Sequence, residues 1–177
     1  MKKIILVSLI LSLFSFSKCK KDRPDSNGLP PATQTGANTL GFLLNGQTWT
    51  PKGWNGSTTN LSLYYDDSYH DGTFNIASYR LLGQGNEQSF AIAMDSFQTT
   101  GTFYLTKNSN LEVVFIDDLQ KCTITAFDTS VYRKGKLVIT KFDKLNQILS
   151  GTFDFTLYKS DCGDSIKITA GRFDLKY

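Results

Sequence analysis

The chain has 177 residues, of which 13% are aromatic and 20% charged, so its composition excludes a disordered chain and suits one globular domain with a hydrophobic core. Its formal net charge is +3, but Lys2, Lys3 and Lys18 lie in a segment that we expect to be removed. The remaining basic and acidic residues balance at 16 each. Because no basic excess remains to attract phosphates, we expect no nucleic-acid partner.

Residues 1–18 have the pattern of a bacterial signal peptide. Two lysines precede an apolar run from Ile4 to Phe16 that is broken only by serines. As a helix this run would span about 20 Å, which is too short for a hydrocarbon core of about 30 Å. That length fits the apolar region of a signal peptide, so we predict that the chain is exported.

Cys19 directly follows the apolar run and is the candidate for lipidation. In a bacterial lipoprotein such a cysteine is acylated and becomes the new N-terminus, and "CKKDRPD" resembles the start of many lipoproteins of the Bacteroidota envelope. Lys18 departs from the small residue that is usual before this cysteine. The small residues that an ordinary signal-peptidase site needs are missing as well. The position of Cys19 directly after the apolar run and the polar residues that follow it still favour lipidation. We therefore expect a lipid anchor in the outer membrane of a bacterial cell envelope, on its periplasmic face or at the cell surface.

Residues 19–39 are predicted to be the lipidated cysteine and a disordered tether. The stretch from Lys20 to Thr39 contains three prolines, two glycines and almost no apolar residue, so it cannot form a core. The alternative is a disordered tail without an anchor. Both interpretations place the start of the folded domain at residue 40.

Residues 40–177 form a single domain with the pattern of β-strands. Short apolar alternations are separated by turn residues, and Asn45-Gly46 between two apolar segments is a strong signal for a β-hairpin. In "SFAIAM" and "LEVVFI" every second residue is large and apolar. No stretch has helical periodicity, so the domain is predicted to be all-β.

The last third of the chain alternates most clearly. In "GTFDFTLY", Phe153 and Phe155 share one face with Leu157. In "SIKITAGRFDLKY" the phase of the alternation flips across Ala170-Gly171, which predicts a two-residue turn between two strands. Upstream, "KLVITKFD" and "QILSGTF" predict another hairpin.

We count about ten strands with short connections and no crossover helix. This pattern predicts an antiparallel two-sheet β-sandwich built from hairpins and meanders. The alternative is a closed up-and-down β-barrel, because some strands carry apolar residues on both faces.

Four motifs carry a resemblance to a known family: "NGQTWTP", "LVITKFD", "ILSGTFDFT" and "ITAGRFDLKY". They resemble an uncharacterised family of Bacteroidota cell-envelope lipoproteins that contains a domain of unknown function. The resemblance runs from about Leu40 to Tyr177 and implies an envelope location and a β fold. It implies no activity and no catalytic residues.

The only histidine lies in "YYDDSYHDG", where Asp66, Asp67, His70 and Asp71 are weak candidates for metal ligands. A solvated turn explains these residues better, since no regular D-x-D-x-D spacing is present, and we expect no metal and no cofactor. No catalytic residues are predicted either: there is no G-x-S-x-G motif, and Asp117-Asp118 suits a turn better than an acid–base pair.

Two cysteines remain besides Cys19. Cys122 and Cys162 either form a disulfide, which an oxidising envelope would favour, or stay as one buried and one exposed thiol. Three aromatic residues are candidates for stacking on a ligand: Trp54 in the loop "PKGWNG", Tyr65 and Tyr69.

These features favour a non-enzymatic, lipid-anchored envelope protein that binds a glycan or a partner protein. A hydrolase that acts on glycans through two carboxylates is one alternative, and a purely structural envelope component is another.

Overall fold

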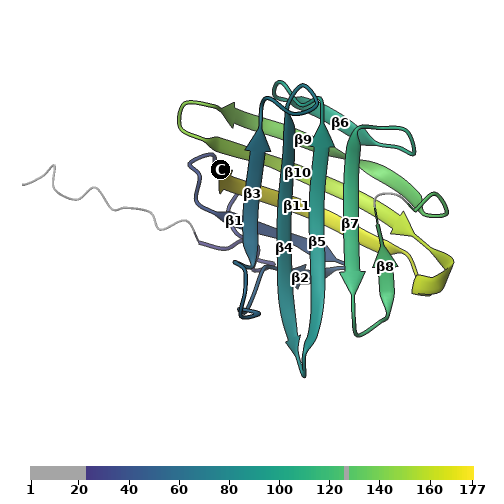
Figure 1. Ribbon diagram of the computed structural model, residues 1–177. Coiled ribbons are helices and arrows are strands. Elements are labelled where there is room, and N and C mark those ends of the chain that lie inside the picture. Colours follow the sequence, from purple (N-terminus) through teal and green to yellow (C-terminus); the bar gives the residue numbers. More distant parts are fainter. Residues whose placement is uncertain (1–22, 126–127) are drawn as a thin grey trace, which may run out of the picture.

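The computed structural model describes residues 23–125 and 128–177. These residues form an all-β domain of two antiparallel sheets with six and five strands (Figure 1). The predicted two-sheet sandwich is confirmed. The two sheets stay separate in the described part of the chain, so the alternative of a closed barrel is wrong. The predicted signal peptide and Cys19 lie outside the described residues.

The six-stranded sheet combines the two ends of the described chain. Its strands lie in the order β2-β1-β11-β10-β9-β6, with β1 paired to the last strand of the protein. Their bounds are β1 (Thr39–Leu44), β2 (Gln47–Trp49), β6 (Gly101–Leu105), β9 (Tyr132–Asp143), β10 (Ile148–Tyr158) and β11 (Ile166–Lys176).

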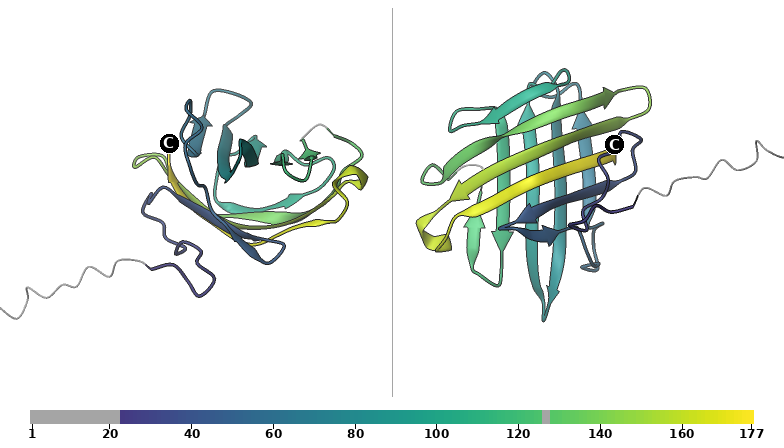
Figure 2. Two further views of the ribbon diagram at one scale, coloured as in Figure 1. Left: turned by 90° about the horizontal axis from the view of Figure 1, so that it is seen from below. Right: turned by 180° about the vertical axis from the view of Figure 1, so that it is seen from behind.

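The five-stranded sheet is built from the middle of the chain in the order β3-β4-β5-β7-β8. Its bounds are β3 (Leu61–Asp66), β4 (Thr73–Gly83), β5 (Asn86–Asp95), β7 (Leu111–Asp117) and β8 (Cys122–Ile124), and a short 3-10 turn, η2 (Ser160–Cys162), joins β10 to β11. Figure 2 shows the six-stranded sheet curving along one side of the five-stranded sheet, whose other face is left open. Across the described ranges, no helix has the length and apolar character needed to cross a membrane.

Two of the three predicted hairpins in the six-stranded sheet are confirmed. Asn45 and Gly46 form the two-residue turn between β1 and β2, with φ values of 49° and 82°. Positive φ at both central positions is what an Asn-Gly hairpin turn requires. The second hairpin joins β9 to β10, which pair along their whole length.

The predicted turn at Ala170-Gly171 is wrong. β11 runs without a break from Ile166 to Lys176 and pairs with β10 on both sides of this dipeptide. The register shifts between Phe153 and Phe155, and Ala170 has a φ of 52°. A β-bulge therefore causes the flip in phase, because one extra residue changes which face the following side chains occupy.

Aromatic side chains join the two sheets at the centre of the core. Phe90 of β5 lies 4.7 Å from Phe42 and 5.4 Å from Phe153 between ring centroids, and Phe42 stacks on Trp49 at 4.6 Å. All four residues are at most 1% exposed. Such ring pairs add about 0.5–1.5 kcal/mol each beyond the burial of their area, so this cluster sets how the sheets face one another.

Residues 23–38, which we call the N-terminal strap, lie on the outer face of the six-stranded sheet. This differs from the expected disordered tether, which was predicted to reach residue 39. Leu29 is fully buried, and Asp25 forms an ion pair of 3.0 Å with Arg172 of β11. The strap is irregular in secondary structure, but it packs on the sheet from Asp25 onward.

A buried carboxylate holds the strap. Asp174 lies on the outer face of β11, between core residues of the same strand, yet it is fully buried because the strap covers it. It accepts five hydrogen bonds from the strap, at 2.6–3.2 Å, and a sixth of 2.8 Å from the hydroxyl of Ser150. The donors in the strap are the hydroxyls of Thr33 and Thr35 and the backbone amides of Thr35, Gly36 and Ala37.

These bonds favour the charged form of the carboxylate. Burial by itself raises the pKa of Asp174, but the hydrogen bonds from Thr33, Thr35, Ser150 and Gly36 outweigh it and hold the pKa well below its usual value. A group with a lowered pKa in the folded state stabilises the fold above its unfolded pKa. That contribution is lost as the pH falls through the folded pKa.

We expect Asp174→Asn to destabilise the fold by about 2–4 kcal/mol, because the amide cannot accept all the hydrogen bonds that the carboxylate accepts. Urea unfolding measures this loss. Below about pH 4 the wild type should lose stability more steeply than the variant, since its unfolded state binds a proton at this carboxylate while its folded state does not. Asp161→Asn, at a carboxylate whose side chain is 76% exposed, is the matched control and should be near neutral. Equal stability of Asp174→Asn and wild type at neutral pH would contradict the assigned role.

Candidate functional site

The open face of the five-stranded sheet carries a groove of about 490 Å³. Its floor is a row of small side chains on four adjacent strands: Ser62 on β3, Ala77 on β4, Ala91 on β5 and Val114 on β7. At a strand spacing of about 4.8 Å this row is about 14 Å long. Because small side chains leave the backbone surface accessible, the sheet offers an elongated shallow groove instead of a deep pocket.

Hydroxyl groups surround this floor. Thr58 and Thr59 line the groove from the loop that precedes β3, and Ser89 and Tyr79 line it from β5 and β4. No carboxylate, imidazole or thiol lines the groove among the described residues. The groove can therefore form hydrogen bonds and apolar contacts, but its lining carries no acid–base pair.

The loop of residues 52–60 forms the wall of the groove and is fastened to the sheet. Lys52 forms a backbone bridge to Arg80, and the backbone amide of Asn55 donates a hydrogen bond of 3.1 Å to the hydroxyl of Tyr79. That hydroxyl donates in turn to the carbonyl of Thr58 at 2.8 Å. Tyr79 is only 6% exposed although it lies on the outer face of the sheet, because this loop covers it. The wall is thus held in place by a buried side chain.

Trp54 lies in this loop and is 73% exposed. Gly53 before it has a φ of 89°, and a Cβ at that position would lie 2.8 Å from the side chain of Leu81. Only glycine fits there without strain, so the chain can turn tightly and present the indole to solvent. The structure thus places Trp54, a predicted stacking residue, in the same loop that walls the groove.

The other two predicted stacking residues lie away from the groove. Tyr65 points inward, and its ring lies 5.1 Å from both Phe142 and Tyr177 between centroids. Its role as a ligand-stacking residue is therefore corrected to core packing. Tyr69 is 56% exposed and stacks on His70 in the β3–β4 loop, at the opposite end of β3 from the loop that contains Trp54.

Tyr64 was not among the predicted stacking residues, although it is an exposed aromatic residue. It is 62% exposed and lies on the same face of β3 as Ser62. Successive residues of a strand point to opposite faces, so Tyr64 and Tyr65 cannot both face solvent. The dipeptide alone carried no signal to show which one does. Tyr64 therefore joins Trp54 as an exposed ring on the grooved side of the sheet.

The residues considered as metal ligands do not converge. No group of three or more His, Cys, Asp or Glu side chains suited to a metal ion occurs among the described residues. Asp66 instead accepts hydrogen bonds from Ser68 and Tyr64, which lower the pKa of Asp66, and Asp67 lies 4.0 Å from the ammonium of Lys144.

His70 pairs with a residue outside the predicted cluster. Its Nδ1 lies 3.0 Å from Oδ2 of Asp95, and Thr73 donates a hydrogen bond to the other oxygen of that carboxylate. The hydrogen bond with His70, followed by that from Thr73, lowers the pKa of Asp95. Asp71 and His70 both have positive φ values, of 57° and 48°, which marks them as turn residues.

A polar row crosses the inner face of the five-stranded sheet at one end. Gln88 accepts hydrogen bonds from Trp49 Nε1 at 3.0 Å and from Arg80 Nη2 at 2.8 Å, and it donates to Asp117 Oδ2 at 2.5 Å. Asp117 and Asp118 do not act as a pair, because Asp117 faces this row while Asp118 accepts from the amide of Glu87. Gln88 and Asp117 satisfy one another inside the fold, which explains their burial, whereas the Nε of Arg80 has no hydrogen-bond partner.

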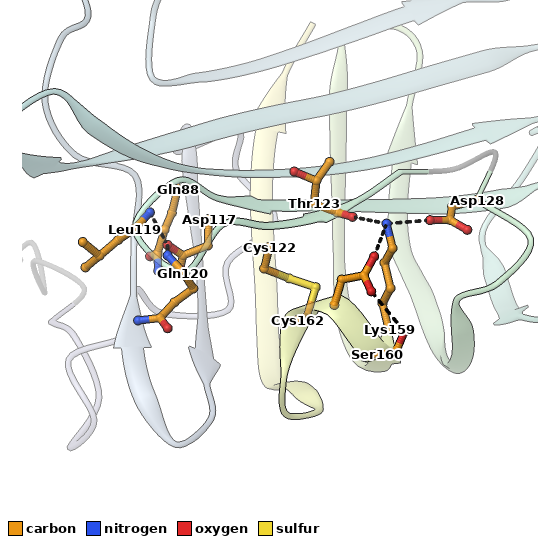
Figure 3. Close-up of a disulfide and its surroundings, with 11 residues drawn as sticks. Gln88, Asp117, Leu119, Gln120, Cys122, Thr123, Asp128, Lys159, Ser160 and Cys162 are labelled. Carbon is orange, nitrogen blue, oxygen red and sulfur yellow. Dashed lines mark hydrogen bonds and ion pairs between the residues drawn. A yellow bond between two sulfur atoms is a disulfide. The ribbon is translucent and has the colours of Figure 1, made fainter.

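Cys122 and Cys162 form a disulfide in the structure, across 40 residues of sequence (Figure 3). It ties β8 of the five-stranded sheet to η2, the turn that joins β10 and β11 of the six-stranded sheet. Beside it, Lys159 lies 2.9 Å from Asp128 and donates to the carbonyl of Thr123. Hydrogen bonds from Ser130 and Lys159 lower the pKa of Asp128 to about 2. One edge of the sandwich is therefore closed by a covalent bond and an ion pair.

The fold and the groove define a two-sheet β-sandwich with one open, grooved sheet. Residues 44–174 match the family described as a domain of unknown function, DUF6252. The match spans most of the chain, so the protein belongs to this family. No curated protein and no solved structure gives a significant match. The expectation of an uncharacterised family is thus confirmed.

We expect the disulfide to contribute about 4 kcal/mol to the free energy of unfolding, because it closes a loop of 40 residues in the unfolded chain. Urea unfolding of the Cys122→Ser/Cys162→Ser double variant should show this loss. Thiol titration of the unfolded protein should show two more thiols with reductant than without it. Equal thiol counts under both conditions would contradict the bond.

Proposed function

We propose that this protein is a non-enzymatic, lipid-anchored protein of a bacterial cell envelope that binds an extended glycan chain in the groove of the five-stranded sheet. The groove, whose wall is formed by the loop that carries the exposed Trp54, is the observation that carries the proposal. The signal-peptide pattern and Cys19 support the location, and the resemblance to Bacteroidota envelope lipoproteins supports the same compartment.

The shape and chemistry of the groove suit a sugar chain. A row about 14 Å long accommodates about three sugar rings in an extended chain, and its small side chains let the rings approach the sheet. The hydroxyls of Thr58 and Thr59 can exchange hydrogen bonds with sugar hydroxyls, and the hydroxyl of Ser89, which donates to Glu87 at 2.6 Å, can accept one. Exposed aromatic rings such as Trp54 present a flat apolar face of the kind that packs against a sugar ring.

The absence of carboxylates from the described lining favours binding over hydrolysis. A glycoside hydrolase acting by two carboxylates would need them about 5–10 Å apart across its substrate. The groove offers hydroxyls and apolar atoms instead. The fastening of its wall to Tyr79 favours a recognition surface over a purely structural sheet, because a preformed wall lowers the entropic cost of binding.

The glycan proposal is tested by measuring affinity on a glycan array and then by calorimetry with the best ligand. We expect Trp54→Ala to weaken binding about tenfold, because an aromatic contact is worth about 0.5–1.5 kcal/mol beyond its buried area. Tyr69→Ala removes a comparably exposed ring far from the groove and should leave the affinity unchanged. Ala77→Phe, which fills the floor, should abolish binding. Binding that survives Ala77→Phe, or no binding to any glycan, would refute the proposal.

The anchor is tested by radiolabelled palmitate. We expect the exported wild-type chain to incorporate the label and Cys19→Ala to lose it, since acylation requires the cysteine. The Cys122→Ser/Cys162→Ser double variant is the control and should keep the label. Incorporation that persists in Cys19→Ala would show that the lipid is attached elsewhere.

A further inference from the structure

The outer face of the six-stranded sheet exposes three tyrosines and three lysines that have no role in the groove. Tyr104, Tyr132 and Tyr158 are 66%, 54% and 44% exposed, and the lysines beside them are also exposed. We call this set the tyrosine–lysine face: Tyr104, Tyr132, Lys134, Lys136, Tyr158 and Lys167. Exposed rings that form one contiguous patch are typical of an interaction surface.

The strand register makes the tyrosine–lysine face one continuous surface. Tyr132 lies directly opposite Tyr158, and Tyr104 lies opposite Lys136. Thr156 lies between the other two lysines and is paired with both Lys134 and Lys167. Neighbouring strands are about 4.8 Å apart, and residues on one face of a strand are about 7 Å apart, so these groups occupy an area about 15 Å across.

The charge of this face is positive. None of the ion pairs within the described ranges includes Lys134, Lys136 or Lys167. Asp154 lies opposite Lys136, but one of its oxygens already accepts a hydrogen bond from the amide of Ala170. The array therefore presents three ammonium groups against one carboxylate, which complements a negatively charged partner.

The path of the chain indicates which partner lies close to this face. The N-terminal strap packs on the same side of the six-stranded sheet, as Figure 2 shows, and holds on to Arg172 and Asp174. The described chain begins at Arg23, four residues after Cys19. Four residues reach at most about 14 Å. If the chain is anchored at Cys19, this short linker keeps the side of the domain that carries the strap close to the anchor.

We propose that the tyrosine–lysine face docks on a membrane surface that contains anionic phospholipid headgroups, so that the groove on the opposite sheet points away from the membrane. Tyrosine rings are enriched at membrane interfaces, and lysines near an anionic leaflet contribute about 1 kcal/mol each. Because the strap lies on the same outer face, these tyrosines and lysines are on the side of the domain nearest the anchor. The inference rests on the proposed membrane anchor and is independent of the ligand in the groove.

Lysine footprinting on vesicles tests this arrangement. The full chain, attached through its own N-terminus, is treated with an acetylating reagent on vesicles of phosphatidylcholine alone or mixed with phosphatidylglycerol. Mass spectrometry then compares the rates at Lys134, Lys136 and Lys167. We expect several-fold slower acetylation of these three on the anionic vesicles. Lys52 and Lys121, which are exposed on loops at one end of the sandwich, serve as controls in the same molecule and should react equally on both.

Two further measurements sharpen the test. About 1 M salt should remove the protection, because it shortens the Debye length to about 3 Å. The variant Lys134→Glu/Lys136→Glu/Lys167→Glu should leave Tyr104, Tyr132 and Tyr158 open to iodination on anionic vesicles, whereas the wild type protects them. Unprotected lysines on anionic vesicles, equal protection on both vesicle types, or equal protection by soluble heparin would overturn membrane docking.

The same experiment separates this inference from the glycan proposal. Trp54→Ala should lose glycan affinity while its lysine protection stays unchanged. The triple lysine variant should lose the protection of Tyr104, Tyr132 and Tyr158 against iodination while its glycan affinity stays unchanged. A loss of both properties in the triple variant would overturn the assignment of two independent faces.

Discussion

The packing of Phe90 against Phe42 and Phe153 is the interaction on which the rest of the structure depends, because it joins the two sheets through the centre of the core. Each sheet has one face committed to this core. The side chains that alternate with the core residues must then face outward. The groove and the tyrosine–lysine face are these two outer surfaces, so one packing constraint separates them onto opposite sides of the domain.

Two further interactions fasten parts of the domain that aromatic packing does not reach. Asp174 binds the N-terminal strap to the last strand, and the disulfide between Cys122 and Cys162 joins the two sheets at β8 and η2. The first uses a buried charge that is satisfied by hydrogen bonds, and the second uses a covalent bond. Neither interaction covers the outer face of the five-stranded sheet, which therefore stays open. The N-terminal strap lies on the opposite side of the domain.

Much of the fold and part of the site could be predicted from the residues. The alternation of apolar and polar residues indicated the strands, and the Asn45-Gly46 pair indicated the turn between β1 and β2. Both signals depend only on neighbouring residues, so they can be seen in the sequence. Ala170-Gly171 was misread because a bulge and a tight turn flip the alternation in the same way. The groove could not be predicted from the sequence, since its floor of Ser62, Ala77, Ala91 and Val114 comes from four separate strands, and small residues form no recognisable motif.

The sequence by itself determined that this protein is all-β, which segments alternate, and that Trp54 lies in a glycine-flanked loop, because each of these follows from neighbouring residues. Only the tertiary structure decided that Tyr64 faces solvent while Tyr65 packs against the core, and that the segment around Thr35 is held on Asp174, 139 residues away. The physical reason is that burial and hydrogen-bond partners depend on which strands lie side by side. That is a property of the packed sheets and not of any single stretch of chain.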